Sequence, residues 1–291
     1  MDNYGWTTSG TALISSDKII LTSDTKSQAG SIWLLKVRFL IIFLPVHFRN
    51  WRVKIDFRIH SEGKKLFGDG LAFWYIKSYA DTGSVYGVNE RFNGLGIILD
   101  TYPNHEKSEE YPRVSAQLND GTKMYDALKD GFPTEFESCS YDFRRSSTNI
   151  FISYFGSNST LVVEFEDPIH YIRSSCIMSD FVLLPTGYYI GISAATGDLS
   201  DNHEVYSVDF ESLDDMFHVD RQTSAKYEKV KPELKNFHKQ IPEAKRESGG
   251  FWRFIKRLSL FILILFIGGT IVQVAYMIWK KREKERRKRF Y

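Results

Sequence analysis

The sequence predicts an all-β fold in which an antiparallel β-sandwich is followed by one C-terminal transmembrane helix. Between residues 51 and 213, short runs alternate apolar and polar side chains, which is the pattern of half-buried strands. Turns rich in Gly, Asn and Asp separate these runs, and few stretches have the period of an amphipathic helix. Farther along the chain, residues 258–279 form an uninterrupted apolar run.

Eight runs show the strand pattern most clearly. In a chain of 291 residues with 43% hydrophobic residues, they can enclose one sizeable core, with an appendage left over. No repeat of fixed period is present in the sequence. We expect strands at residues 53–59, 71–76, 96–99, 114–118, 150–155, 161–165, 188–193 and 205–210.

The apolar run at residues 258–279 is long enough to cross a membrane. As a helix, its 22 residues would measure about 33 Å, which matches the hydrocarbon core of a bilayer. A buried helix of a globular domain is the alternative, but such a helix seldom lacks every charge over this length. The following residues, 280–289, contain eight Lys or Arg and two Glu. The positive-inside rule therefore predicts a type I single-pass protein with a cytosolic C-terminus.

The same basic cluster bears on the choice of partner. The formal net charge of the chain is +2, so the remainder of the sequence is mildly acidic. Because the basic residues form one juxtamembrane tail rather than a patch interleaved with aromatic residues, the sequence does not favour a nucleic acid as the partner.

We expect four parts along the chain. Residues 1–213 would form a luminal domain, 214–257 a charged stalk, 258–279 the membrane helix and 280–291 a basic cytosolic tail. The stalk lacks a sustained heptad pattern and is interpreted as a solvated spacer. The first residues lack the basic and apolar regions of a signal peptide, so we expect a truncated start. The alternative is that the membrane helix itself serves as the targeting signal.

Residues 34–48 fit this organisation poorly. They are apolar but too short to span a bilayer, and they carry Lys36 and Arg38. An exposed apolar strand of this kind would be an aggregation hazard. Our hypothesis is that they form an anomalous insert from a gene-model artefact, such as a short retained intron, which sequencing the transcript would test.

Two motifs place polar side chains at the ends of predicted strands. G-D-G-L-A-F-W-Y holds Asp69 between two glycines just before an aromatic strand, and D-T-Y-P-N follows another strand. Asp100, Tyr102 and Asn104 are spaced i, i+2 and i+4, so on an extended backbone their side chains share one face. Carboxylates and an amide can supply the oxygen ligands that Ca²⁺ requires. An EF-hand loop beginning at Asp100 is excluded, because His and Tyr occupy its essential Gly and Glu positions.

Together, the two motifs resemble the calcium-dependent sugar site of the L-type (legume-like) lectins. Within that family the chain is most similar to the vesicular integral-membrane lectins, the mannose-binding cargo receptors of the early secretory pathway. The run from Gly10 to Thr22 is also typical of the family. The resemblance implies the jelly-roll form of the β-sandwich and Ca²⁺ as the cofactor.

The resemblance also implies a role for each residue of the site. Calcium would be bound by Asp100, the Tyr102 carbonyl, the Asn104 side-chain oxygen and Asp130. Asp69 would follow a cis peptide bond and accept hydrogen bonds from sugar hydroxyls. The other predicted carbohydrate contacts are Ser27, the Asn104 amide, Gly197, Asp198 and Leu199.

Three further features suit a luminal domain with a cytosolic tail. Cys139 and Cys176 are the two cysteines of the chain, and a single pair in an oxidising compartment indicates a disulfide, which the resemblance also implies. Asn158 begins an N-glycosylation sequon. The C-terminal residues resemble a transport signal that vesicle-coat components read; they are Lys288, Arg289, Phe290 and Tyr291.

One departure from the family pattern puts sugar binding in question. The family motif Y-D-H-x-x-D-G has Ala127 in place of its His, which donates a hydrogen bond to mannose. Losing one such hydrogen bond costs about 0.5–1.5 kcal/mol. The predicted function is calcium-dependent binding of high-mannose N-glycans on cargo glycoproteins, in membranes of the endoplasmic reticulum, the intermediate compartment and the Golgi. The alternative is a membrane cargo adaptor whose sugar site is weakened or lost.

An enzyme is not predicted. A glycoside hydrolase on a similar jelly roll would need two carboxylates flanking the scissile bond, about 5–10 Å apart. The sequence has no Glu-rich strand motif of that type, and the carboxylates of its two motifs are assigned to metal and to sugar hydroxyls.

Overall fold

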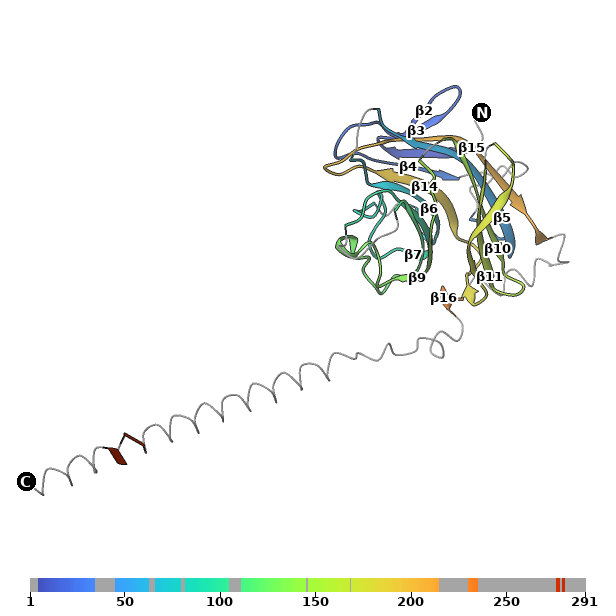
Figure 1. Cartoon of the computed structure of the whole chain (residues 1–291). Helices are drawn as coiled ribbons and strands as arrows, with labels where there is room; N and C mark the ends of the chain where they lie inside the picture. Colours follow the sequence, from blue (N-terminus) through green and yellow to red (C-terminus); the bar gives the residue numbers. More distant parts are fainter. Residues whose placement is uncertain are drawn as a thin grey trace, which may run out of the picture. The chain divides into compact units, whose positions relative to one another are not determined.

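The computed structural model describes most of the first three quarters of the chain and a few residues near its end. The described residues are 5–34, 45–62, 66–79, 82–104, 111–144, 146–167, 169–214, 230–234, 276–277 and 279–280. The chain divides into two compact units, Met1–Asn236 and Phe237–Tyr291. The first unit is a β-sandwich (Figure 1).

In the second unit, the predicted membrane helix and the tail with Lys288, Arg289, Phe290 and Tyr291 lie almost wholly outside the described residues. Residues 276–277 and 279–280 are helical. Over the part of the chain that the structure describes, no helix has both the length and the apolar character needed to cross a membrane.

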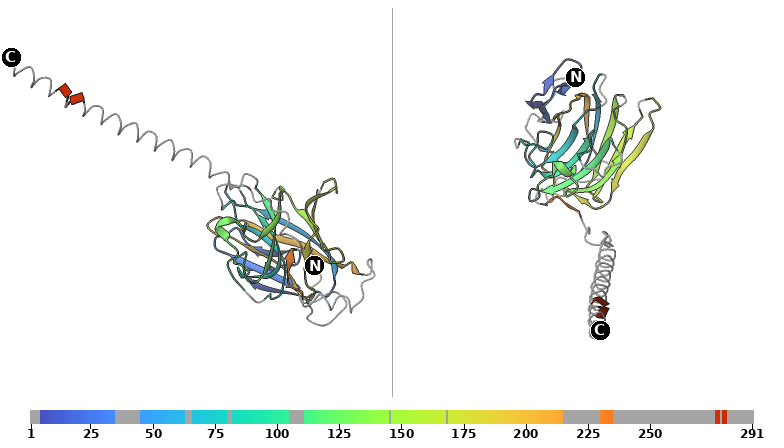
Figure 2. Two further views of the ribbon diagram at one scale, coloured as in Figure 1. Left: turned by 90° about the horizontal axis from the view of Figure 1, so that it is seen from below. Right: turned by 60° about the vertical axis from the view of Figure 1, so that its left-hand side comes forward.

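Within the described residues, antiparallel strands form two seven-stranded sheets that face one another (Figure 2). Neighbouring strands are often distant in sequence, since β4 and β6 both pair with β14. The first sheet contains, in spatial order, β1 (Trp6–Gly10), β4 (Ala29–Leu34), β14 (Tyr189–Ala195), β6 (Gly70–Ile76), β7 (Asn93–Asp100), β8 (Arg113–Asp120) and β9 (Glu135–Ser140).

The second sheet contains β12 (Arg173–Ser179), β11 (Thr160–Glu166), β10 (Thr148–Phe155), β5 (Asn50–His60), β15 (Asn202–Ser212), β3 (Ile19–Thr22) and β2 (Leu13–Ile14). A two-stranded sheet joins β13 (Val182–Leu183) to β16 (Glu233–Leu234), and a short 3-10 helix, η1, covers Ala127–Lys129. The predicted all-β antiparallel sandwich is confirmed, and each of the eight predicted runs falls on a strand.

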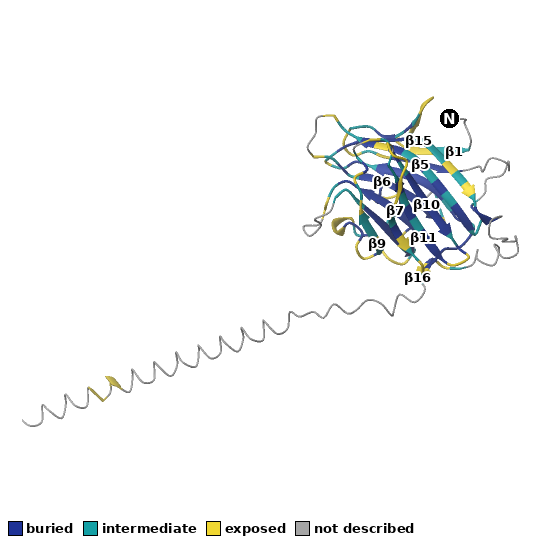
Figure 3. Cartoon of the chain, turned by 45° about the vertical axis from the view of Figure 1, so that its right-hand side comes forward, coloured by how far each residue is buried: buried dark blue, intermediate teal, exposed yellow. Residues whose placement is uncertain are grey.

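The core lies between the two sheets, where dark blue strands meet in Figure 3. In β5 the residues Val53, Ile55 and Phe57 are fully buried, while the residues between them are partly exposed. This period of two places one face of β5 against the core. Trp51 occupies the middle of the core, with the rings of Tyr75 and Tyr154 at 5.1 and 5.8 Å from its own.

The first sheet is covered on its outer face as well. Every residue of β6 is buried, because a second apolar cluster packs on the side of β6 that faces away from the core. Trp74 anchors this cluster: its ring lies against Phe92, and its indole nitrogen donates to Ser193 Oγ at 2.7 Å. The segment that contains Val85 and Tyr86 is held against the sheet in this way.

Both ends of the predicted insert 34–48 belong to the sandwich. Leu34 ends β4 and pairs with Trp6. Val46 is buried, and it exchanges backbone hydrogen bonds of 2.7 Å with Tyr188 and Gly187. Residues 35–44 lie outside the described residues, and the gene-model hypothesis for them stays a prediction.

The predicted stalk also has a structured part. Glu233 and Leu234 form β16 and pair with β13, so the first unit extends to Asn236 rather than ending near residue 213. This pairing could not be predicted from the sequence, because a two-residue strand has too few positions to show a period.

The disulfide between Cys139 and Cys176 is present and joins β9 to β12. These strands are the outermost strands at one side of the two sheets. The bridge therefore closes that side of the sandwich covalently, where edge strands have few buried side chains to hold them.

Replacing both Cys139 and Cys176 by serine should lower the free energy of unfolding by about 4 kcal/mol, because the bridge closes a loop of 37 residues in the unfolded chain. Guanidinium unfolding without reductant would measure the loss, and reductant added to the wild type should reproduce it. Equal unfolding midpoints and slopes for the two proteins would contradict this expectation.

Candidate functional site

Three neighbouring strands of the first sheet bring the predicted residues to one end of the sandwich. In the pairing of β14, β6 and β7, Gly70 lies opposite both Ala195 and Asp100. Asp69 just precedes β6, Asp100 ends β7, and the loop with Gly197 follows β14. The two sequence motifs and the glycine loop therefore meet at this end.

The backbone of Asp69 is fixed from both neighbouring strands. Its N–H donates to the Ala195 carbonyl at 3.2 Å, and its own carbonyl accepts from the backbone and hydroxyl of Thr101 at 2.9 and 3.0 Å. The peptide bond between Gly68 and Asp69 is cis, which confirms the prediction at this position. The Asp69 side chain is half-buried at the surface of the site.

The extended backbone that was expected through Asn104 ends at Asp100. β7 stops there, and the chain turns as the Tyr102 N–H donates to Asp100 Oδ1 at 2.9 Å. A turn, rather than a shared face of one strand, therefore brings the residues of D-T-Y-P-N together. The Asn104 N–H donates to Asp130 Oδ1 at 3.1 Å, which joins this turn to the loop of Asp130.

Asp130 is positioned by the 3-10 helix η1. It is the C-cap of that helix, with φ of 49° in the left-handed region, and its side chain is buried. Its N–H donates to the Ala127 carbonyl at 3.3 Å. The hydroxyl of Tyr111 donates to Asp130 Oδ2 at 2.9 Å, a contact that the sequence did not predict.

Burial and mutual repulsion dominate the electrostatics of the carboxylates. Burial raises the pKa of Asp100 well above its usual value, the Tyr102 N–H opposes this, and the charges of Asp130 and Asp69 raise the pKa further. A hydrogen bond from Tyr86, a member of the second apolar cluster on the outer face of the first sheet, partly lowers the pKa of Asp100. A cation bound beside these carboxylates would offset the repulsion.

A cluster of three or more His, Cys, Asp or Glu side chains suited to a metal is not found among the described residues. The predicted calcium set does not need one, because Tyr102 would contribute a backbone carbonyl and Asn104 an amide oxygen. Such oxygen ligands are the type that Ca²⁺ takes alongside carboxylates.

Asp69 and Gly197 are in close contact. A Cβ added to Gly197 would lie 3.1 Å from Asp69 Oδ2, which is tighter than nine in ten real Cβ contacts. Burial, followed by the charge of Asp198, raises the pKa of Asp69 to about 6. Glycine at 197 thus lets a loop backbone approach the carboxylate directly.

The loop with Ser27 lies beside the same glycine. The Ser27 N–H donates to the Gly197 carbonyl at 3.1 Å, and Thr196 bonds to Gln28 and Thr25 at 2.9 and 2.7 Å. Ser27 itself is exposed. The structure therefore gathers the predicted residues at one end of the sandwich: Ser27, Asp69, Asp100, Tyr102, Asn104, Asp130, Gly197, Asp198 and Leu199.

Ala127, which replaces the family histidine, is the first residue of η1 and is exposed. The helix is capped by Asp126, whose side chain accepts from the Leu128 N–H at 3.1 Å. With Ala127 as its first residue, η1 forms and holds Asp130 at its C-cap.

Tyr86 and Tyr111 are residues of the site that sequence reasoning missed. Tyr86 follows a glycine- and serine-rich segment without periodicity, and Tyr111 precedes Pro112 outside any predicted strand. Neither residue lies in a periodic run or in one of the two motifs, so the sequence carried no local signal for either.

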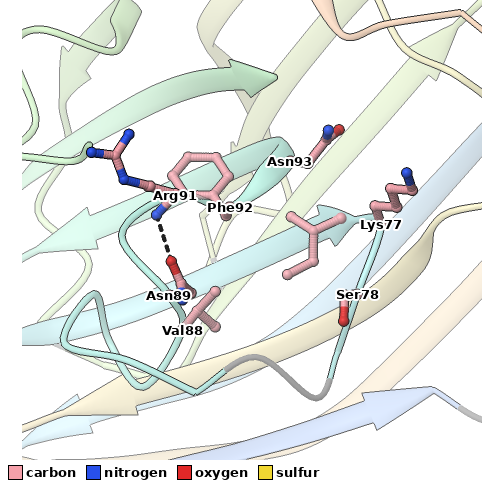
Figure 4. A pocket seen from close by; sticks show the side chains of 8 residues that line it. Lys77, Ser78, Val88, Asn89, Arg91, Phe92 and Asn93 are labelled. Carbon is pink, nitrogen blue, oxygen red and sulfur yellow. Dashed lines mark hydrogen bonds between the residues drawn. The ribbon is translucent and has the colours of Figure 1, made fainter. Parts of the chain in front are cut away.

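Two other features lie away from the site. Asn158 is exposed in the turn between β10 and β11, where an attached glycan would meet solvent. A small pocket opens at the other end of β6 and β7, and Figure 4 shows Lys77 and Arg91 pointing away from one another at its rim. The two cations do not converge on one point there.

An antiparallel sandwich that gathers buried carboxylates, an exposed amide and a close glycine loop at one end has the architecture of a lectin. The sequence profile of the legume-like lectin family matches residues 3–220. This chain therefore belongs to the legume-like lectin family, as its motifs predicted.

Relatives match nearly the whole chain. The human vesicular integral-membrane protein VIP36 is 35% identical over 294 residues, which cover 98% of this chain and 79% of that protein. The human VIP36-like protein is 34% identical over 299 residues, covering 98% of this chain and 80% of its own length.

Solved structures give the same result. The luminal domain of VIP36 in its calcium- and mannose-bound form is 36% identical, with a TM-score of 0.70, and covers 79% of this chain and 89% of that one. Its metal-free form also has a TM-score of 0.70. The carbohydrate recognition domain of Emp47p, 23% identical with a TM-score of 0.57, covers 72% of this chain and 88% of its own, and it supports the fold alone.

Asp69→Asn should remove part of the pH dependence of stability in EDTA. The native pKa of Asp69, about 6, lies above the value near 4 of an unfolded chain, so the native state binds this proton more tightly. The contribution of Asp69 to wild-type stability should therefore fall as pH rises from about 4 to about 6, and Asp69→Asn should lack this contribution to the slope. Urea unfolding across this range would test it; identical slopes would count against the shifted pKa.

Proposed function

We propose that this chain is a calcium-dependent lectin that binds high-mannose N-glycans on cargo glycoproteins. The observation that carries the proposal is the contact of Asp69 with Gly197 beside the buried Asp100 and Asp130. These residues come from separate segments and meet at one end of a legume-like lectin fold. The calcium-, mannose- and Man3GlcNAc-bound structures of VIP36 support the choice of ligand.

The donor set fits calcium. Asp100 and Asp130 would supply carboxylate oxygens, Tyr102 its carbonyl and Asn104 its side-chain oxygen. Two buried carboxylates that repel one another are stabilised by a divalent cation, and Ca²⁺ takes mixed oxygen ligands of this kind. When bound, the ion would supply positive charge and hold the Asn104 side chain so that its NH₂ can donate to sugar.

The sugar would be bound mainly by Asp69. An ionised carboxylate accepts hydrogen bonds from two hydroxyls and makes stronger bonds than a neutral acceptor. Backbone groups of Gly197, Asp198 and Leu199, together with Ser27, would complete the contacts. Because the carboxylates are engaged by metal and sugar hydroxyls in this arrangement, we infer binding without hydrolysis, and the protein is not an enzyme.

The membrane part of the proposal rests on the sequence. The apolar run at residues 258–279 and the tail at 280–291 would make a type I protein of endoplasmic reticulum, intermediate compartment and Golgi membranes. The names of the relatives, vesicular integral-membrane proteins, support this. The predicted coat signal comprises Lys288, Arg289, Phe290 and Tyr291.

Calcium should stabilise the chain, and Asp100→Ala should abolish the gain. Binding to the native state alone adds about 2.7 kcal/mol at a hundredfold excess over Kd. Thermal unfolding with calcium and with EDTA measures the difference. Asp180→Ala, in the turn after β12, is a control that should keep the full calcium effect. An unchanged melting temperature in the wild type would contradict the four-ligand assignment.

Ala127→His should tighten mannose binding by up to about tenfold, equivalent to about 1.4 kcal/mol, because it restores the missing donor next to the loop of Asp130. Calorimetric titration of wild type and variant with oligomannose in calcium provides the comparison. Asp69→Asn should abolish binding, and Thr122→His controls for an added exposed histidine.

Equal affinities for wild type and Ala127→His would show that position 127 does not face the sugar. Binding by neither protein at millimolar sugar would favour the adaptor alternative, in which the sandwich binds cargo polypeptide directly.

A further inference from the structure

Arg144 forms a buried, two-bonded ion pair with Asp201. Its Nη2 donates to Asp201 Oδ1 at 2.7 Å and its Nε to Oδ2 at 3.2 Å. The Asp201 side chain is fully buried and that of Arg144 is 16% exposed. Removing two charges from water is unfavourable unless good geometry and additional hydrogen bonds offset the lost hydration. We therefore ask which segments this ion pair joins.

The flat face of the same guanidinium covers Phe67. The Arg144 Cζ lies 3.2 Å from the centre of the Phe67 ring, and Nη2 also approaches Ser61 Oγ at 3.4 Å. A planar guanidinium can bind a carboxylate with its edge and an aromatic ring with its face at once, which an ammonium cannot do. Arg144 thus contacts two segments that are far apart in sequence.

Each of these segments carries predicted sugar contacts. Phe67 lies two residues before Asp69, and Asp201 lies two residues after Leu199. The segments lie close together, because a Cβ added to Gly68 would be in van der Waals contact with Leu199 Cβ, at 3.5 Å.

Asp201 is in turn fixed to the rest of the sandwich. Its carbonyl accepts from Thr22 Oγ1 at 3.3 Å. On either side of it, Ser200 Oγ donates to Asp24 Oδ1 at 2.7 Å, and the Asp24 N–H donates to Asn202 Oδ1 at 2.9 Å. The end of the glycine loop therefore has a firm anchor, to which Arg144 joins the Asp69 segment.

We propose that Arg144 is a positioning residue for carbohydrate binding, which holds the Asp69 segment and the Gly197–Leu199 loop at the spacing that one sugar ring requires. The proposal rests on the proposed lectin function. Loops held in the bound arrangement lose less conformational entropy when ligand binds, so affinity depends on such a clamp. Calcium affinity should depend on Arg144 less than sugar affinity does, because Asp100 and Asp130 are positioned by β7 and η1.

The test compares Arg144→Ala, Arg144→Lys and Arg173→Ala in the full-length chain. Arg173 is a matched control, since it also lies over an aromatic ring, at 3.6 Å from the centre of Phe151, and pairs with Glu166 at 3.4 Å. Calorimetry would give the Kd for mannobiose and, separately, the Kd for calcium. Hydrogen exchange would report protection of the amides of Asp69 and of residues 195–200.

Arg144→Ala should raise the mannobiose Kd at least tenfold and leave the calcium Kd within about twofold. Arg144→Lys should fall between the wild type and Arg144→Ala, because it keeps the charge but loses the planar fork. Arg173→Ala should change neither constant. Protection of the two segments should fall in Arg144→Ala and stay unchanged in Arg173→Ala.

An unchanged mannobiose Kd in folded Arg144→Ala would overturn the proposal, as would an equal loss of calcium and sugar affinity. If Arg144→Ala does not fold, Arg144→Lys carries the same comparison. If the wild type binds no mannobiose, the lectin function fails, and the exchange measurement still decides whether Arg144 holds the two segments together. Unchanged protection of both segments would then refute it.

Discussion

The burial of Asp100 and Asp130 is the constraint on which the rest of the site depends. A carboxylate removed from water is costly unless hydrogen bonds or an opposite charge replace its hydration. Here backbone N–H groups of two tight turns, with the hydroxyl of Tyr111, point at these oxygens. Three features contribute to this arrangement: the turn after β7, the capping of η1, and the second apolar cluster on the outer face of the first sheet, which supplies Tyr86. The repulsion between the two carboxylates remains, and a bound cation would offset it.

The two sheets contribute differently to this arrangement. The first sheet carries Asp69 and Asp100 at the ends of β6 and β7, and the register of these strands sets their spacing, while Asp130 caps η1 in the loop between β8 and β9. The second sheet contributes Asp201 at the start of β15, through which Arg144 reaches the Asp69 segment. The site itself faces solvent, but buried charged groups, among them Asp201 and Arg144, support it. Stability and ligand recognition meet in these residues, so a variant there must be judged on both.

Elements that leave a pattern in neighbouring residues could be predicted from the sequence, and contacts between distant segments could not. Strands such as β5 and β6 were predicted because burial on one face, or on both, leaves a periodic or continuous apolar pattern. The edge strands β9 and β12 were missed, since few of their side chains are buried. The site residues were found through motifs of a known family, and the assignment of their roles stays a prediction. Arg144 and Tyr86 act across segments distant in sequence, so no local pattern marks them.

The pairing of β16 with β13 alters the geometry of attachment. If the membrane helix begins at residue 258, only residues 235–257 separate it from the sandwich, and a fully extended chain of that length reaches at most about 80 Å. A tether that began at residue 214 could reach about 150 Å. β16 lies beside the β10–β11 turn, which is next to Asn50 at one end of β5, whereas the loop that holds Leu199 leads into β15 at the other end of β5. With the proposed membrane helix, this shorter tether would keep the end of the sandwich that carries Asp69 and Asp100 within a smaller volume near the membrane, which would raise its effective concentration toward a ligand held at the same membrane.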